Sequence, residues 1–217
     1  MSLIYLRING DDESKQGDTR LHDAIATGDL SRIQKFIEQG IDVNQLNYKE
    51  GFTPLTQAVF LGHLEILKVL IEAGANLRQF DNTPSTPLCL AAELGNIEAV
   101  RLLLGAGANV DLGGLESPLG CAVNYGHIDI ANILISAGAK LNSTDESGIT
   151  PLMLAAISGR LDLAQLLVEA GADVNAVDEY KNTALRKASE TGHQDVFNYL
   201  YPLTDDKFPY IDEEIPF

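Results

Sequence analysis

Residues 148–178 read GITPLMLAAISGRLDLAQLLVEAGADVNAVD, and this stretch decides the fold because its register recurs along the chain. Leu152 is followed by Ala155 three positions later, by Gly159 seven positions later and by Gly171 nineteen positions later. The key leucines of six such units, spaced by 34, 33, 31, 33 and 33 residues, are Leu21, Leu55, Leu88, Leu119, Leu152 and Leu185. A period of this length in six copies indicates a repeat protein.

Each unit predicts two short helices joined by a turn. Thr or Ser two positions before the key leucine is a helix cap, and four units then have a proline: Pro54, Pro87, Pro118 and Pro151. The first glycine supplies a left-handed cap, and the second glycine ends the second helix. Apolar residues at plus nine, fifteen and sixteen from the key leucine, such as Leu161, Leu167 and Val168, predict one buried stripe.

A unit of this size cannot bury its own apolar face, so neighbouring units must stack into a continuous core. The terminal units carry more polar residues on their second helices, for example Lys35 and Gln194, as expected of capping repeats. We therefore predict an N-terminal segment over residues 1–17, a repeat domain over 18–203 and an acidic, aromatic tail over 204–217.

The strings at 51–77 (GFTPLTQAVFLGHLEILKVLIEAGANL) and 148–178 resemble the ankyrin repeat, with its T-P-L-x-x-A, G-H and G-A-D-V-N signatures. The resemblance implies an all-α solenoid of helix–turn–helix units with β-turn fingers, and a concave face lined by the fingers and the first helices. It also implies recognition of proteins and no catalysis. The pattern departs from the family at the compressed finger 112–117, the longer loop 47–52 and Pro84, so we expect an irregular recognition edge.

Composition narrows the choice of partners. The chain has 15 Lys and Arg residues against 31 Asp and Glu residues, a formal net charge of −16. Nucleic acid and anionic membranes need a cationic surface, so we expect neither as a partner. No apolar run is long enough for a transmembrane helix, and the N-terminus does not resemble a signal peptide. Two cysteines, Cys89 and Cys121, fit a reducing compartment, and we expect a cytoplasmic protein.

The titratable residues fit the repeat framework. His63, His127 and His193 share the plus-eight position, which is polar in every unit, and His22 is interpreted as a hydrogen-bonding histidine of the first helix. The acids at plus ten stand in the first turn of the second helix, where they interact favourably with its dipole: Glu65, Glu98, Asp129, Asp162 and Asp195. No Cys/His cluster has zinc spacing. We predict no metal, no cofactor and no catalytic residue.

The candidate binding residues come from positions that vary between units. By analogy with the family, the two residues before each first glycine point into the concave groove, and the finger residues join them. The candidates are Tyr48, Phe52, Phe60, Leu61, Glu93, Leu94, Leu115, Tyr125, Ile149, Ile157 and Tyr180. An acidic rim is expected from Glu93, Glu116, Glu146, Glu179 and Glu190. The alternative is that several of these side chains pack between adjacent units.

The leading functional hypothesis is a non-enzymatic, monomeric interaction module that binds a protein or peptide on its concave face. A basic partner is preferred on electrostatic grounds, and an inhibitor or an adaptor is the role considered. The alternatives are a scaffold that self-associates and an enzyme, either with a cryptic site or with this array as one part. The tail over 204–217 is read as a disordered acidic segment or as a strap on the last repeat, and alternatively as a short linear motif.

Overall fold

The computed structural model describes residues 19–47, 51–78, 85–113 and 117–205, which form twelve helices and no strand. The first helices of the six units are α1 (Arg20–Ala26), α3 (Pro54–Leu61), α5 (Pro87–Glu93), α7 (Pro118–Tyr125), α9 (Pro151–Ile157) and α11 (Ala184–Thr191). The second helices are α2 (Leu30–Glu38), α4 (Leu64–Glu72), α6 (Ile97–Gly105), α8 (Ile128–Ser136), α10 (Leu161–Glu169) and α12 (Gln194–Leu200). The all-α solenoid predicted from the sequence is thereby confirmed.

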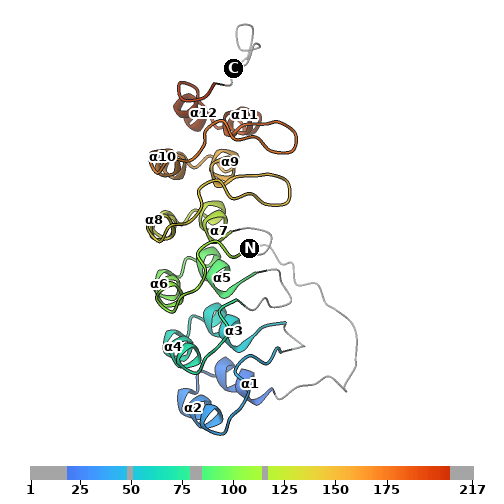
Figure 1. The fold of residues 1–217 in the computed structure, drawn as a ribbon, viewed down its shortest axis with the longest axis vertical. Coiled ribbons are helices and arrows are strands. Elements are labelled where there is room, and N and C mark those ends of the chain that lie inside the picture. The colour runs from blue at the N-terminus through green and yellow to red at the C-terminus, as the bar shows by residue number, and fades with distance from the viewer. Residues whose placement is uncertain (1–18, 48–50, 79–84, 114–116, 206–217) are drawn as a thin grey trace.

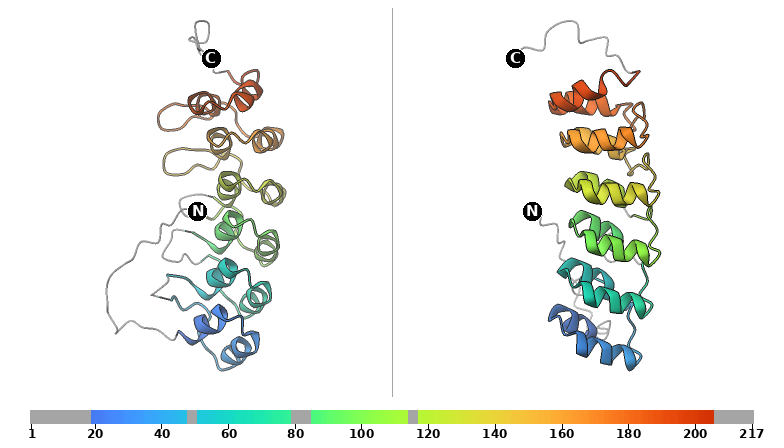
Figure 2. Two further views of the ribbon diagram at one scale, coloured as in Figure 1. Left: turned by 180° about the vertical axis from the view of Figure 1, so that it is seen from behind. Right: turned by 90° about the vertical axis from the view of Figure 1, so that its left-hand side faces the viewer.

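The first and second helices form two columns (Figure 1), and the loops that lead into α9 and α11 project from one side of the stack. The stack is bowed, with the first helices and these loops on its inner side. The two other views show the same ladder of helix pairs from behind and from the side (Figure 2). A continuous core of buried Leu, Ile, Val and Ala side chains runs between the columns through all six units.

Five of the six predicted caps form. The side chains of Thr53, Thr86, Ser117, Thr150 and Thr183 each accept a hydrogen bond from the backbone amide three residues on. Thr19 does not, so this part of the prediction is wrong. Its backbone is helical (φ −79°, ψ −5°), whereas a side-chain cap needs an extended residue, and its hydroxyl lies 3.5 Å from the Asp23 carboxylate instead.

The stripe predicted on the second helices is fully buried at plus fifteen, whereas its residues at plus nine and sixteen are half-buried and pack against the core. Leu70 is buried, but Leu64 and Ile71, at plus nine and sixteen, are half-buried, and the same holds for Leu161 and Val168. The other buried positions are plus eleven and twelve, as in Ile66–Leu67, Ala99–Val100, Ile130–Ala131 and Leu163–Ala164. Position fifteen follows position eleven by four residues and position twelve by three, so the three positions share the face that meets the first helices.

Hydrogen bonds between loops tie neighbouring units together. The side-chain oxygen of Asn44, at plus twenty-three of the first unit, accepts from the backbone N–H of Asn76 in the next loop at 2.7 Å. The pairs Asp111–Lys140, Asn142–Asp173 and Asn175–Asp205 repeat this bond at 2.8, 2.9 and 2.9 Å. We call it the loop-to-loop hydrogen bond.

The loop-to-loop hydrogen bonds continue past α12, because Asn175 also accepts from the Thr204 hydroxyl at 2.8 Å. The described chain after α12 therefore packs onto the preceding loop as a further unit would. The predicted N-terminal segment 1–17 and the rest of the predicted tail, from residue 206, lie outside the described residues.

The plus-eight residue makes a second link between units at the start of each second helix. Asp29 and Asn96 cap their own helices, and the other four residues do not. His63, His127, Arg160 and His193 lie instead against the first glycine of the preceding unit, namely Gly28, Gly95, Gly126 and Gly159. We call this the helix-start contact, and it confirms the framework interpretation of the three histidines.

Candidate functional site

Exposed apolar side chains lie at the ends of three successive first helices, α3, α5 and α7. Phe60 and Leu61 end α3, Leu94 follows α5 and Tyr125 ends α7. All four are exposed, with 44% of the Phe60 surface and 50% of the Tyr125 surface accessible to solvent. Leu61, Leu94 and Tyr125 share the plus-six position on three neighbouring first helices. We call these four residues the apolar row.

The apolar row is confined to units two to four. In the fifth and sixth units the plus-six residues are Ser158 and Thr191, which are polar, and the Thr191 hydroxyl donates to the carbonyl of Lys187 at 2.7 Å. Tyr180, 78% exposed, lies apart from the row in the loop before α11. The apolar row therefore does not extend into the fifth and sixth units.

Phe52 links the second loop to the apolar row. Its ring stacks on Phe60, with centroids 5.4 Å apart and an angle of 27° between the planes. Phe52 itself is half-buried, so it supports Phe60 more than it presents surface of its own.

The remaining candidates are less accessible or are not described. Glu93, Ile149 and Ile157 are half-buried, and Ile149 packs against the core, as the packing alternative expects. Tyr48 and Leu115 lie outside the described residues.

The predicted acidic rim is partly visible. Glu146 and Glu179 are exposed at equivalent positions of two neighbouring loops, and neither has an ion-pair partner among the described residues. Glu190 is exposed but lies 3.7 Å from Arg186, which offsets its charge. Glu116 is outside the described residues.

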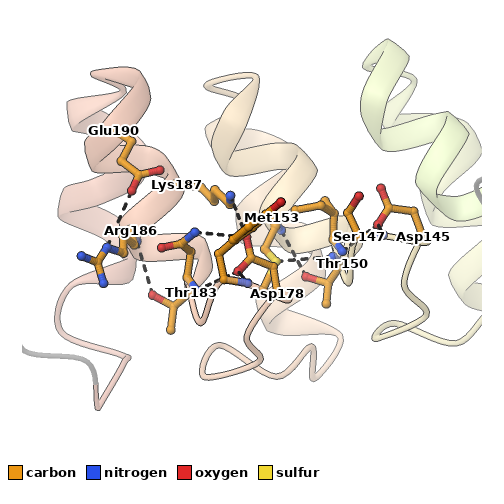
Figure 3. A network of polar contacts seen from close by, with 12 residues as sticks. Asp145, Ser147, Thr150, Met153, Asp178, Thr183, Arg186, Lys187 and Glu190 are labelled. Atoms are coloured by element: carbon orange, nitrogen blue, oxygen red, sulfur yellow. Dashed lines mark hydrogen bonds and ion pairs between the residues drawn. The ribbon is translucent and has the colours of Figure 1, made fainter.

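A buried carboxylate holds the loop before α11 in shape. One oxygen of Asp178 accepts from the backbone amides of Tyr180 and Asn182, and the other lies 2.7 Å from the ammonium group of Lys187 (Figure 3). Burial opposes the ionisation of Asp178, but the hydrogen bonds from Lys187 and Asn182 outweigh it and lower its pKa to about 2. No pattern in the sequence predicted this ion pair, although Lys187 stands where the fifth unit has Leu154.

The two neighbouring loops contact each other directly. The amide of Glu179 donates to the carbonyl of Ser147 at 3.2 Å, and the Asp145 carboxylate shapes its loop as Asp178 does, accepting from Ser147 and Ile149. The exposed Glu146 and Glu179 therefore lie on two turns whose shape is fixed by hydrogen bonds to the Asp145 and Asp178 carboxylates, which Figure 3 shows.

The histidines are bound in structural contacts. The ring of buried His22 lies between the side-chain oxygen of Gln57 at 2.6 Å and the carbonyl of Gln45 at 2.8 Å, as its hydrogen-bonding interpretation predicts. His127 and His193 bond to backbone carbonyls of the preceding unit. Within the described part of the chain, no three His, Cys, Asp or Glu side chains are grouped as metal ligands.

None of the helices in the described ranges combines the length and the apolar character that crossing a bilayer requires. Both cysteines are buried, and neither belongs to a disulfide.

Comparisons with known proteins agree with this architecture. A family model described as ankyrin repeats (3 copies) matches residues 2–81, 21–114, 79–145 and 119–208. The ankyrin repeat domain of Bcl-3, described as a unique member of the IkappaB protein family, superposes with a TM-score of 0.80 at 28% identity, covering 87% of each chain.

The curated relatives match over shorter stretches. Ankyrin repeat domain-containing protein 40 of Mus musculus and of Homo sapiens is 38% identical over 64 residues, which are 30% of this chain and 18% and 17% of those proteins. Ankyrin repeat, SAM and basic leucine zipper domain-containing protein 1 of Microcebus murinus is 36% identical over 63 residues, 29% of this chain and 13% of that protein. The matched stretch thus spans less than a fifth of each of these relatives. Taken with the six helix pairs and the overlapping family matches, these findings show that the chain belongs to the ankyrin-repeat family, whose members are generally protein–protein interaction modules.

Proposed function

We propose that the chain is a non-enzymatic binding module that holds a protein or peptide on its inner face. The observation that carries this proposal is the apolar row, because four large apolar side chains remain accessible side by side on an otherwise well-buried framework. Aromatic and aliphatic anchors of this kind supply most of the affinity at protein interfaces, where truncating one typically costs about 2 kcal/mol or more.

The partner that fits this face best has basic residues next to the apolar surface that contacts the apolar row. Glu146 and Glu179 are exposed on the loops that flank the inner side, and the whole chain has a net charge of −16. Such charges steer a cationic partner toward the face and disfavour an acidic one. We propose that the chain acts as an adaptor or an inhibitor, as a monomer in the cytoplasm. Two buried cysteines that form no disulfide suit a reducing compartment.

The binding face is tested with matched surface substitutions. Leu94→Ser with Tyr125→Ser removes the centre of the apolar row, and Tyr201→Ser with Leu203→Ser is the control, since Leu94 and Leu203 are both 44% exposed. Quantitative affinity capture from the native host, followed by mass spectrometry, compares the proteins retained by each variant and by the unchanged chain. We expect a partner to be lost from the row variant and kept by the control. Equal retention by both would assign the interaction to another surface.

The charge preference needs a separate comparison. Glu146→Gln with Glu179→Gln removes the exposed acids of the loops, and Glu72→Gln with Glu98→Gln removes two exposed acids from second helices. For a captured partner, the loop variant is expected to slow association and to weaken its dependence on salt, whereas the second-helix variant changes both less. The same response from both variants would show that only the net charge of the chain matters.

A further inference from the structure

Among the described residues, the boundary between the second and third units lacks the loop-to-loop hydrogen bond. Its acceptor position, plus twenty-three of the second unit, is occupied by Arg78, where the neighbouring units have Asn44, Asp111, Asn142 or Asn175. An arginine side chain has only donors, so it cannot accept the backbone N–H of the next loop. Arg78 is exposed, and its own amide bonds to Asn76 within the same loop.

The same boundary lacks the helix-start contact. The plus-eight residue of the third unit is Asn96, whose side chain accepts from the Ala99 amide at 3.0 Å and so caps its own helix. It does not reach back to Gly62, and a Cβ placed on Gly62 would meet nothing within 4 Å among the described residues. In contrast, a Cβ on Gly95 would lie 2.7 Å from Cε1 of His127 in the following unit.

The boundaries on either side have both links. Units one and two are joined by Asn44 to Asn76, by His63 against Gly28 and by the buried His22–Gln57 hydrogen bond of 2.6 Å. Units three and four are joined by Asp111 to Lys140 and by His127, whose ring nitrogen lies 2.9 Å from the Glu93 carbonyl.

Apolar contact remains at the second boundary, but it constrains geometry less than hydrogen bonds do. Burial of Leu, Ile and Ala surface is non-directional, so a small rotation changes its free energy little. A hydrogen bond weakens steeply once its angle and distance depart from their optimum. A boundary without the two directional links therefore resists rotation less than its neighbours.

We propose that the array moves as two blocks, units one and two against units three to six, about the boundary marked by Arg78 and Asn96. The apolar row crosses this boundary, since Phe60 and Leu61 belong to the first block and Leu94 and Tyr125 to the second. The movement changes the spacing between the two halves of the row, which adapts the inner face to its partner. This consequence for binding rests on the proposed function, whereas the movement itself is a property of the free chain.

The movement is measured by spin-label distances across two boundaries. Glu65→Cys with Glu98→Cys places labels across the second boundary, and Asp129→Cys with Asp162→Cys places them at the same plus-ten positions across the fourth, which has both links. All four residues are exposed in the first turn of a second helix, so the pairs are matched. Cys89 and Cys121 are buried, and the unchanged chain controls for any labelling of them.

We expect a broader distance distribution for the Glu65–Glu98 pair than for the Asp129–Asp162 pair. Arg78→Asn restores the missing acceptor and Asn96→His restores the residue found in three other units, and together they should narrow the first distribution toward the second. Arg78→Asn alone, an exposed loop change, is the second variant if Asn96→His disturbs the helix cap, and circular dichroism checks folding. Equal widths for the two pairs, or a width that neither variant narrows, would overturn the proposal. Because no partner is present, these outcomes are independent of whether the apolar row binds one.

Discussion

Nε2 of His127 lies 2.9 Å from the carbonyl oxygen of Glu93, so a ring from one unit closes the end of the first helix in the unit before it. A carbonyl only accepts, so this nitrogen carries the proton. The close approach also explains why residue 95 is glycine. Its φ of +72° favours glycine, and a Cβ there would overlap the His127 ring.

This relationship predicts a difference between two histidines at the same position. His63 lies against Gly28 without a hydrogen bond from its ring to any described residue, so His63→Ala removes packing alone. His127→Ala removes packing and the hydrogen bond, and should lower the free energy of unfolding by about 0.5–1.5 kcal/mol more than His63→Ala does. Urea denaturation of both variants gives the comparison, and equal losses would show that the bond contributes no net stability.

In the fifth and sixth loops, removing and introducing glycine at the same repeat position should have opposite effects on stability. Gly148 and Lys181 both have positive φ, +78° and +65°. A Cβ at Gly148 would lie 3.1 Å from the backbone nitrogen of Glu179 in the next loop. Gly148→Ala should therefore destabilise the chain by about 1–2 kcal/mol from backbone strain, and by more because of this contact.

Lys181 is exposed, so its side chain fits there and only the backbone strain remains. We expect Lys181→Gly to stabilise by up to about 1 kcal/mol, reduced by the greater chain entropy of glycine in the unfolded state. Thermal melts of the two variants provide the measurement. A stabilising Gly148→Ala would contradict the contact between the two loops.

The pKa of Asp178 predicts how its contribution depends on pH. The folded-state pKa of about 2 is below the ordinary value of 3.8, so the charged form stabilises the fold above the ordinary pKa, and this stability is lost as the pH falls toward 2. Asp178→Asn keeps an oxygen acceptor for the loop amides but leaves Lys187 without its carboxylate.

At pH 7, Asp178→Asn should therefore cost about 1.5–3 kcal/mol, the range for hydrogen bonds to charged groups. The difference from the unchanged chain should shrink between pH 4 and pH 2, where Asp178 itself becomes protonated. Urea midpoints measured at several pH values test this, and Glu179→Gln, at an exposed neighbour, controls for the change in net charge. A deficit that does not vary with pH would assign the effect to the loop geometry and not to the charge.

The caps predict a contrast between the first unit and the fifth. Thr150 accepts from the Met153 amide at 3.2 Å, so Thr150→Ala should cost about 1 kcal/mol. Thr19 makes no such bond, so Thr19→Ala should have a clearly smaller effect on the urea midpoint. If the two substitutions lower the urea midpoint equally, the conclusion that Thr150 caps its helix and Thr19 does not would be wrong.

The amino-acid sequence by itself determined the repeat, its helices and most of its caps. Proline at the first helical position, Thr before it and glycine after it act within a few residues, so Thr150, Pro151 and Gly159 could be assigned without a structure. The polar plus-eight position could likewise be recognised as framework.

Only the tertiary structure decided how the units meet. The buried face at plus eleven and twelve, the reach of His127 to Glu93, the Asp178–Lys187 pair and the missing acceptor at Arg78 each depend on contacts made by packing. His127 and Glu93 are about one repeat apart in the sequence, and the plus-eight residue contacts the preceding unit in four units but caps its own helix in two. Stacking sets those pairings, and no local pattern in the sequence specifies them.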